Sequence, residues 1–512
     1  MFRAIRNLLR LATICRALTR HDALFLLEIT DGGRMLARIL HLFANRRYAS
    51  LRPGQRLALA LQSLGPSFVK FGQALSTRSD LIGEQVAADL SELQDRVPAF
   101  PAAAARAIIA SELGRPVETL FQSFTDEPVA AASISQVHFA ITAEGAEVAV
   151  KVLRPGIESQ FARDIALFYW LAAGIERTVP FLRRLRLVDS VRAFEDSVTL
   201  EMDLRFEAAA AAEMTDNFAD DPTFTIPSID WQRTARRVLT LERIHGISID
   251  EVEALKAAGH DLVAITEKAA DAFFNMVFRD GFFHADMHPG NLFVGEDGQL
   301  IAVDFGITGR VDKQTRRFLG EMLIGFLNGD YRKVAEVHFA AGYVPADKSI
   351  DAFSQACRSF AEPILERPLH EISIARLLGQ LFQVTETFAM EMQPQLLLLQ
   401  KSMLVAEGVG RHLNPEINMW QLARPLIEQW MADNLGPQAR LKESAGVVLA
   451  SLESLPRLIS HAEKTVEALR QGGIRLHPDT LKSLEPKRSG LFPNWLPWAL
   501  VVVLAAALLW RR

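Results

Sequence analysis

The chain has very few cysteines and no block of basic residues in its middle. Only Cys15 and Cys357 occur among 512 residues, too few and too far apart for a disulfide framework or a cysteine-based zinc site. The net charge is −5 and no long central run of lysine or arginine is present, which argues against nucleic acid as the main partner. The sequence therefore predicts a protein of a reducing compartment that does not bind nucleic acid.

The chain contains enough apolar residues to form a large hydrophobic core. Its 512 residues are 49% hydrophobic and 23% charged, which is the composition of a folded protein rather than of a disordered one. This length is sufficient for several domains.

The N-terminal segment lacks the long uninterrupted apolar run of a secretory signal. It has no acidic residue before Asp22 and carries five arginines: Arg3, Arg6, Arg10, Arg16 and Arg20. This pattern predicts a basic amphipathic helix over residues 1–20. Two interpretations stay open, a helix that rests on anionic lipid and a solvated basic face. Composition alone does not exclude a mitochondrial transit peptide.

The C-terminal residues 491–512 contain an uncharged stretch long enough to cross a bilayer. About 20 apolar residues are needed for a span, and Leu491 to Trp510 supplies them. Tryptophans and basic residues flank it as interfacial anchors: Trp495, Trp498, Trp510, Lys487, Arg488, Arg511 and Arg512. We expect a transmembrane helix, and Pro493 and Pro497 leave a re-entrant or interfacial helix as the alternative.

Candidate catalytic residues are concentrated between His284 and Gly306. Asp286 and Asn291 lie five positions apart, and Asp304-Phe305-Gly306 follows a short apolar strand. In protein kinases this order places the first aspartate at the attacking group, while the asparagine and the second aspartate bind Mg²⁺ beside the nucleoside triphosphate. A hairpin turning at residues 295–298 would bring both motifs together. The alternative for either motif alone is ordinary turn aspartates.

A candidate nucleotide-binding roof lies upstream, and it lacks the usual glycines. The segment 128–138 predicts two short strands around a turn of small residues, and a third strand carries Lys151. Ala130, Ala132 and Ser135 occupy the usual glycine positions, and their Cβ atoms restrict the backbone that would approach phosphates. A plain hairpin is the alternative. The expected nucleotide contacts are Ala130, Ala131, Ala132, Ser133, Ile134, Ser135, Gln136, Val137 and Lys151.

A kinase lysine needs a helical glutamate that fixes it against the phosphates. Acidic residues occur in a run from Val191 onward that predicts a helix ending in the alanines 208–212: Glu195, Glu201, Asp203, Glu207 and Glu213. Spacing does not choose among them, because each could equally be a solvated acid on an exposed face.

Residues 57–78 predict two helices separated at Gly65-Pro66. Lys70, Gln73 and Thr77 share one face of the second helix. On periodicity alone this polar face belongs to solvent.

Together these motifs resemble the UbiB family of atypical protein-kinase-like proteins, over roughly residues 46–415. The resemblance rests on Lys70-Phe71-Gly72-Gln73, the loop Ala130-Ala131-Ala132-Ser133, Val148-Ala149-Val150-Lys151, Glu201-Met202-Asp203, His284-Ala285-Asp286 with Asn291, and Asp304-Phe305-Gly306. It implies that Glu207 is the partner of Lys151. It also implies that Lys70, Gln73, Glu201 and Asp203 meet over the active site, where a protein substrate would otherwise dock.

The chain departs from the family pattern in two places. Ser79 and Gly83 stand where many members have prolines, and the tail offers one convincing span where some bacterial members have two. The chain also runs from Gly306 toward a helix without the Ala-Pro-Glu element of ordinary protein kinases, so efficient phosphorylation of other proteins is not expected.

The resemblance implies an α+β, two-lobed protein-kinase-like fold with an N-terminal helical extension and a C-terminal transmembrane helix. The expected divisions are 1–50 (basic amphipathic helices), 51–125 (helical extension), 126–245 (N-lobe), 246–475 (C-lobe), 476–490 (linker) and 491–512 (membrane tail). ATP and Mg²⁺ are the implied cofactors, with Lys151, Glu207 and Asp286 as catalytic residues.

By the same resemblance the chain supports ubiquinone biosynthesis at a membrane. Its implied partners are membrane lipid, polyprenyl quinone precursors and the enzymes that modify them, and a homodimer stays open. The implied location is the bacterial inner membrane, and the mitochondrial inner membrane is the less favoured alternative. The chain would span this membrane once, with the kinase-like part in the cytoplasm. The alternative is a nucleotide-binding pseudokinase scaffold without turnover. A hydroxylase is not supported, because the sequence has no flavin fingerprint or metal-oxygenase triad.

Overall fold

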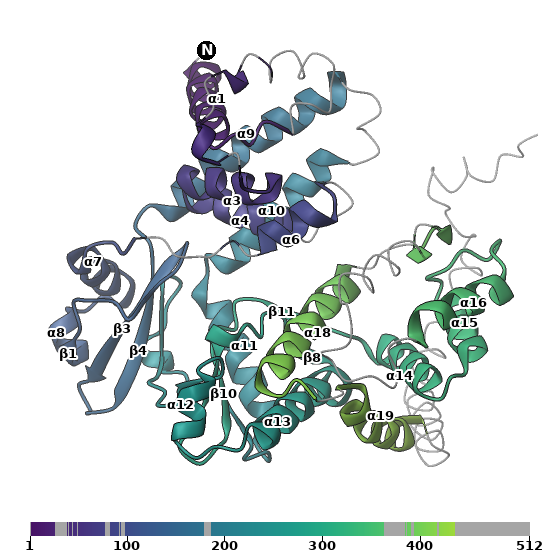
Figure 1. Ribbon diagram of the computed structural model, residues 1–512. Coiled ribbons are helices and arrows are strands. Elements are labelled where there is room, and N and C mark those ends of the chain that lie inside the picture. Colours follow the sequence, from purple (N-terminus) through teal and green to yellow (C-terminus); the bar gives the residue numbers. More distant parts are fainter. Residues whose placement is uncertain are drawn as a thin grey trace, which may run out of the picture. The chain divides into compact units, whose positions relative to one another are not determined.

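The computed structural model describes residues 2–25, 50–76, 98–178, 186–362, 394–416 and 419–435, with shorter pieces between 38 and 48, 82 and 93, and 384 and 390. The chain divides into two units, Met1–Ala432 and Asp433–Arg512. Only residues 433–435 of the second unit are among the described residues, so the fold below is that of the first unit (Figure 1). The expected linker 476–490 and membrane tail 491–512 lie outside the described residues.

Six of the described helices, four from the first 91 residues and two that follow Lys151, share one apolar core. They are α1 Phe2–Arg20, α3 Pro53–Leu64, α4 Pro66–Ser76, α6 Glu84–Ser91, α9 Ile157–Thr178 and α10 Leu187–Glu201, with the short 3₁₀ helix η2 Arg46–Tyr48 between α1 and α3. Aromatic rings join three of them, because Phe71 of α4 lies 4.5 Å from the ring of Phe168 in α9 and 5.6 Å from that of Phe194 in α10. The extension is therefore fixed to the helices that follow Lys151.

The break predicted at Gly65-Pro66 is present. Gly65 has a φ angle of +102°, a conformation in which any side chain is strained, and Pro66 begins α4, where its fixed φ suits a first helical position. The turn lets α3 and α4 pack against each other.

The predicted N-terminal helix is α1, and apolar residues of its second half pack inside the protein. Ile14, Ala17 and Leu18 pack against the shared core. Arg10 donates hydrogen bonds of 2.9 and 3.0 Å to the two carboxylate oxygens of Asp164 on α9. The arginines left exposed at this end include Arg16 and Arg20.

A five-stranded antiparallel sheet carries Lys151. Its strands are β1 Phe121–Phe124, β2 Ala130–Ala131, β3 Ser135–Thr142, β4 Glu147–Leu153 and β6 Val238–Glu242, in the order β1-β3-β4-β6 with β2 also paired to β3. Helix α7 Ala102–Leu113 packs on β4 and β6, and α8 Val117–Leu120 leads into β1 (Figure 1). Val137 on β3 lies opposite both Ala130 and Lys151. The register therefore joins the small-residue loop to the strand that carries the lysine.

The acidic run from Val191 onward is not one helix, and that prediction was wrong. Helix α10 ends at Glu201, and α11 Leu204–Asn217 begins after Asp203, whose backbone is extended. The Asp203 carboxylate caps α11 by accepting a hydrogen bond of 3.2 Å from the backbone N–H of Arg205. An aspartate that bonds its own backbone in this way competes with helix continuation. Glu201 therefore ends one helix and Glu207 starts the next.

Two small sheets hold the motifs between His284 and Gly306. One contains β5 Phe224–Thr225, β10 Leu300–Ala302, β9 Leu292–Val294 and β7 Ile247–Ser248, and the other contains β8 Phe282–His284 and β11 Thr308–Arg310. The predicted hairpin is the antiparallel pair β9 and β10. Asp286 and Asn291 lie between β8 and β9, with Asn291 ending the 3₁₀ helix η6 Pro289–Asn291, and Asp304 lies between β10 and β11. Both connections thus start and end on paired strands.

Helices form the remainder of the described chain. They are α12 Val252–Ala257, α13 Leu262–Phe274, the π-helix η5 Asn275–Asp280, α14 Lys313–Leu327, α15 Tyr331–Ala340, α16 Ile350–Ala361, α18 Pro394–Leu413 and α19 Met419–Leu435, with the 3₁₀ helix η4 Trp231–Arg233 before β6. The helix predicted after Gly306 is α14. Helix α18 packs against α13 and β11 (Figure 1). Among the helices that the structure describes, none combines the length and the apolarity that a membrane span requires.

The expected domain divisions stay predictions. Strand β1 precedes the expected boundary at residue 126 and already pairs with β3. The core shared by α3, α4, α9 and α10 joins the expected helical extension to residues assigned to the N-lobe.

Candidate active site

Lys151 of β4 lies at the centre of the candidate site. Its Nζ atom donates to Glu207 Oε1 at 2.7 Å and Oε2 at 3.0 Å, and to Asp304 Oδ1 at 2.9 Å. Lys151 and Glu207 are largely buried, while the Asp304 side chain keeps 48% of its surface exposed. Of the five acidic candidates for a lysine partner, the structure therefore brings Glu207 to Lys151.

The charges of this cluster are coupled. Burial raises the pKa of Glu207 to about 7, because the attraction of Lys151 is partly offset by the repulsion of Asp304. The pKa of Asp304 is lowered: partial burial acts to raise it, but the charge and hydrogen bond of Lys151, followed by the charge of Lys70, outweigh that effect. Asp304 is thus held ionised, and Glu207 can exchange a proton near neutral pH.

The backbone of Asp304 adopts a sparsely populated conformation. Its φ angle is +62°, in the left-handed region that costs a residue with a Cβ atom about 1 kcal/mol or more. The next residue but one is Gly306, where a Cβ atom would lie 3.3 Å from Asp304 Oδ1. In this conformation the Asp304 carboxylate contacts Lys151, and the side chain of the next residue, Phe305, is buried.

His284 holds the loop that carries Asp286. The ring is buried; its Nδ1 atom accepts a hydrogen bond of 3.1 Å from the backbone N–H of Asp286, and its Nε2 atom lies 3.0 Å from the carbonyl oxygen of Val303. These partners require a neutral ring with its proton on Nε2, and burial lowers the pKa of His284 accordingly. One imidazole therefore ties the Asp286 loop to the residue before Asp304.

Two hydrogen bonds hold Asn291 in position beside Asp286 and Val303. Its side-chain N–H₂ donates to the carbonyl oxygen of Asp286 at 3.0 Å, and its own carbonyl oxygen accepts from the backbone N–H of Val303 at 2.9 Å. The amide oxygen of Asn291 and the exposed carboxylate of Asp304 are hard oxygen ligands of the kind that Mg²⁺ prefers. The donor chemistry at these two positions therefore fits Mg²⁺ bound to nucleotide phosphates.

Lys401 is a residue of the site that sequence analysis missed. Its Nζ atom lies 3.2 Å from Asp286 Oδ1, although 115 residues separate the two in the chain. Helix α18, which is rich in leucine, carries it. A signal was present, because Lys401 is the only charged residue between Glu391 and Glu407 and a lysine within an apolar helix usually has a partner.

The small-residue loop is fixed by Arg154, which sequence analysis also missed. The guanidinium of Arg154 donates to the carbonyl oxygen of Ala132 at 3.0 and 2.8 Å and to that of Pro98 at 2.9 Å. Ala132 in turn donates its backbone N–H to Ser135 at 2.8 Å. Arg154 follows β4 directly, so the strand that carries Lys151 also determines the shape of the loop.

The predicted nucleotide contacts differ in what their side chains do. Gln136 binds the backbone of Phe100 through both its amide atoms, and Ile134 packs into the core. Ser133 is buried, and among the described residues its Oγ atom has no hydrogen-bond partner. Ala130, Ala131 and Ala132 keep part of their surface exposed. The loop therefore offers Ala130 and Ala131 at its surface, while Ala132 is held by Arg154 and Ser135 and the Ser133 hydroxyl is buried.

Lys70 and Glu201 come together, with 2.8 Å between Nζ and Oε2 and little exposure of either side chain. The helical face assigned to solvent by periodicity is therefore partly covered at Lys70. Gln73 donates to the carbonyl oxygen of Leu93 at 3.4 Å, and Asp203 binds the Arg205 side chain.

Comparison with known proteins identifies the family. Residues 92–338 match the ABC1 atypical kinase-like domain, and residues 357–418 match the UbiB helical domain. A protein of Marinobacter nauticus named "Probable protein kinase UbiB" is 44% identical over 437 residues, which are 85% of this chain and 79% of that protein. A protein of the same name from Azotobacter vinelandii is 43% identical over 91% of this chain and 87% of its own length. The chain belongs to the UbiB family.

A solved structure supports the fold assignment. The Mycobacterium tuberculosis protein Rv3197, determined in complex with erythromycin, superimposes with a TM-score of 0.51 at 25% identity and covers 70% of this chain and 90% of its own. The described part of this UbiB family member thus has a kinase-like fold. Lys401 lies in its UbiB helical domain and Asp286 in its ABC1 domain, so the contact between them joins two sequence-defined domains.

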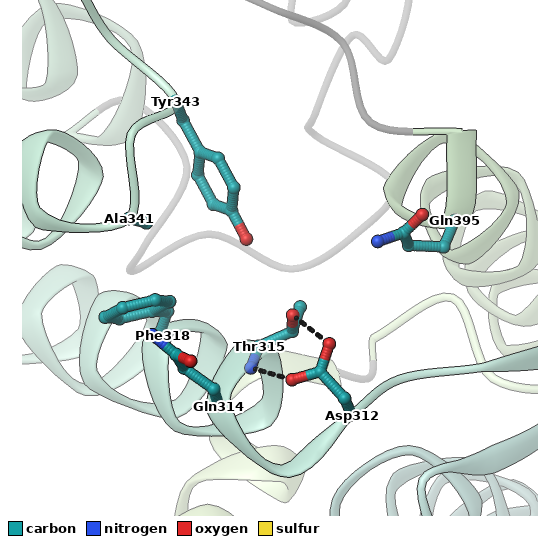
Figure 2. Close-up of a pocket in the computed structure, with 7 residues that line it drawn as sticks. All are labelled: Asp312, Gln314, Thr315, Phe318, Ala341, Tyr343 and Gln395. Carbon is teal, nitrogen blue, oxygen red and sulfur yellow. Dashed lines mark hydrogen bonds between the residues drawn. The ribbon is translucent and has the colours of Figure 1, made fainter. Parts of the chain in front are cut away.

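A separate cavity of about 220 Å³ lies beside the start of α14. Tyr343 and Gln395 point into it from opposite sides, and Thr315 donates to the Asp312 carboxylate at its base (Figure 2). Its lining contains none of the candidate catalytic residues: Asp312, Gln314, Thr315, Phe318, Ala341, Tyr343 and Gln395. The cavity is therefore not where the kinase-like chemistry would take place.

Proposed function

We propose that this UbiB family member is an atypical kinase that hydrolyses Mg-ATP and supports ubiquinone biosynthesis at a membrane. The observation that carries the proposal is the cluster in which Lys151 binds both Glu207 and Asp304. Phosphoryl transfer depends mainly on positioning and charge neutralisation, and this cluster supplies both from β4, α11 and the residues after β10.

Two groups of residues near Lys151 would hold the nucleotide and the metal. The small-residue loop from Ala130 to Ser133 would cover the phosphates, and Lys151 would contact them while Glu207 keeps it in place. Asn291 and Asp304 would provide oxygen ligands for Mg²⁺. When bound, Mg²⁺ would neutralise the charge that develops on the phosphates.

Asp286 would act on the attacking group. Its carboxylate lies in a loop held by His284 and Asn291, and it is about one-third exposed, so a water molecule can reach it. The carboxylate would orient this water and accept its proton, as a general base does. A small nucleophile is favoured because the chain lacks an Ala-Pro-Glu element and because the Lys70 to Glu201 contact ties α4 to the end of α10.

The place in ubiquinone biosynthesis rests on family membership. We propose that polyprenyl quinone precursors, or the enzymes that modify them, are the physiological partners and that ATP turnover drives their handling at the bacterial inner membrane. The sequence of residues 491–512 supports a single membrane span. Ile14, Ala17 and Leu18 of α1 pack against the protein core, so in this part of the helix any contact with anionic lipid would be made by exposed arginines such as Arg16 and Arg20.

The activity is tested with purified full-length protein and labelled ATP. Hydrolysis is measured with and without Mg²⁺, anionic vesicles and a short-chain quinone-precursor analogue. We expect slow Mg²⁺-dependent turnover that rises when vesicles and the analogue are both present. Tight nucleotide binding with no turnover under any of these conditions would instead identify a pseudokinase scaffold.

Membrane attachment is tested by removing residues 491–512. The shortened chain should leave the integral membrane fraction during alkaline carbonate washing, because the proposed span is gone. A matched control carries Pro493→Ala and Pro497→Ala, which favour a straight helix and should keep the protein in that fraction. Equal retention of the shortened and complete chains would show that residues 491–512 do not anchor the protein.

A further inference from the structure

The loop between His284 and Asn291 contains no lysine or arginine. If Asp286 faces the attacking group, the transferred phosphoryl group must lie beside Asp286 during the reaction. Phosphoryl transfer needs positive charge at that group, which proteins supply with lysine, arginine or metal ions. The loop itself therefore does not provide the side-chain cation that the reaction calls for.

Helix α18 places a cation at this position. The Nζ atom of Lys401 is 3.2 Å from Asp286 Oδ1, within one hydrogen bond of the place where the attacking oxygen would lie. The helix is held there because it packs against β11, which pairs with the strand β8 that ends at His284. The same small sheet thus positions both the aspartate loop and the lysine.

The contact has the properties of an open site rather than of a structural ion pair. The Lys401 and Asp286 side chains are 38% and 35% exposed. An ion pair this accessible to water contributes little to stability. It is open to a ligand, whereas the contact between Lys151 and Glu207 is largely buried.

The lysines of the site also differ in their partners. Lys151 binds Glu207 and Asp304, and Lys70 binds Glu201. Lys401 contacts the carboxylate that would face the nucleophile. Because it lies beside Asp286, Lys401 would contact the phosphoryl group that is under attack. Lys151 would instead hold the phosphates of the bound nucleotide.

We propose that Lys401 is a catalytic residue of this site, supplied by the UbiB helical domain, that binds the transferred phosphoryl group. This proposal rests on the proposed ATP hydrolysis. The oxygen of water forms a bond to the γ-phosphorus while the bond from that phosphorus to the bridging oxygen breaks, and its electron pair leaves with ADP. One proton of the water passes to Asp286 and then to solvent. Lys401 stays protonated and donates hydrogen bonds to the γ-phosphoryl oxygens.

The test compares Lys401→Met, Lys401→Arg and the control Lys256→Met, which removes an exposed lysine that pairs with Glu253 on α12. In full-length protein, Lys401→Met should lower kcat for Mg-ATP hydrolysis by about 100-fold with little change in KM. Lys401→Arg should recover much of this loss because it keeps the charge, and Lys256→Met should behave as wild type. Unchanged thermal stability in Lys401→Met is expected from the exposed pair.

A second measurement separates this role from a structural one. Aluminium fluoride added to Mg-ADP imitates the phosphoryl group in transfer, so wild type should bind Mg-ADP more tightly with it than without. Lys401→Met should bind Mg-ADP normally and lose this gain. Equal kcat and an equal gain in Lys401→Met and wild type would overturn the proposal, as would faster hydrolysis by Lys401→Met, which would make the contact inhibitory. Absence of hydrolysis in wild type itself would instead overturn the proposed function.

Discussion

Lys151 and Glu207 are 56 residues apart in the chain, yet the lysine Nζ atom donates to both carboxylate oxygens of Glu207, at 2.7 and 3.0 Å. The same Nζ atom also reaches Asp304, 153 residues further on than Lys151. The pair is thereby connected to the segment whose oxygens are proposed to hold Mg²⁺. A change in any one of the three residues is expected to shift the pKa values of the other two.

Replacing Lys151 should harm both stability and activity. Lys151→Met leaves Glu207 buried without its cation, and breaking a buried pair in this way costs about 3 kcal/mol. Chemical denaturation of Lys151→Met, Glu207→Met and the double variant measures the effect. The double variant should be more stable than Lys151→Met, since no carboxylate is then left unpaired. Additive losses in the double variant would contradict the coupling.

The pH dependence of catalysis should report Glu207. Its pKa is raised from 4.5 to about 7, so the ion pair with Lys151 is completed only as pH rises through this range. We expect kcat/KM for ATP hydrolysis to increase with pH up to about 7 and then level off, and Glu207→Gln to lose this rise along with most activity. A profile that is flat between pH 5.5 and 8 in wild type would contradict the assignment.

The contribution of Glu207 to folding stability changes with pH in the opposite direction to its effect on kcat/KM. Because the pKa is higher in the folded protein than its ordinary value, the fold favours the protonated form. The contribution of this group is fully present below pH 4.5 and is lost as pH rises through about 7. Glu207→Gln, which stays neutral, should remove this part of the pH dependence of Tm.

Asp304 should contribute more to the binding of Mg²⁺ than to the binding of nucleotide alone. Asp304→Asn removes a charged oxygen ligand, so thermal-shift titration should show weaker binding of Mg-ATP and a smaller effect on ATP measured with EDTA. Asp297→Asn, in the exposed turn of the β9 and β10 hairpin, is a matched control and should change neither. Equal losses with and without Mg²⁺ would remove Asp304 from the metal site.

Lys70 should restrain phosphorylation of the protein itself. Its Nζ atom lies 2.8 Å from Glu201, so Lys70→Ala should loosen α4 from the end of α10 and raise the labelled phosphate that the protein incorporates from ATP. Glu201→Gln should have a similar effect because it weakens the same contact, and Lys70→Arg should have less. If Lys70→Ala and wild type incorporate equal phosphate, the contact has no inhibitory role.

The parts of the site that sequence analysis predicts are those held by short connections. Asp286, Asn291 and Asp304 lie within one hairpin and its flanking strands, so their order and spacing were enough to expect them together. Such local patterns carry their own geometric constraints.

The parts that sequence spacing could not supply depend on contacts between distant elements. Glu207 could not be distinguished from Glu201 or Glu213 by periodicity, because the capping aspartate Asp203 resets the helical phase between α10 and α11. Family resemblance identified Glu207 where spacing did not. Lys401 and Arg154 were missed because one lies in an apolar helix and the other acts through backbone carbonyl groups, neither of which forms a recognised motif.

The central claim is that this site transfers the γ-phosphoryl group of Mg-ATP to water. Its most direct test is release of labelled phosphate from γ-labelled ATP by purified wild type, Asp286→Asn and Asp297→Asn. We predict slow Mg²⁺-dependent release by wild type and Asp297→Asn, and release at least about 100-fold slower by Asp286→Asn, with nucleotide binding kept in all three. Equal release by Asp286→Asn and wild type, or no release by a wild-type protein that binds nucleotide, would contradict the claim.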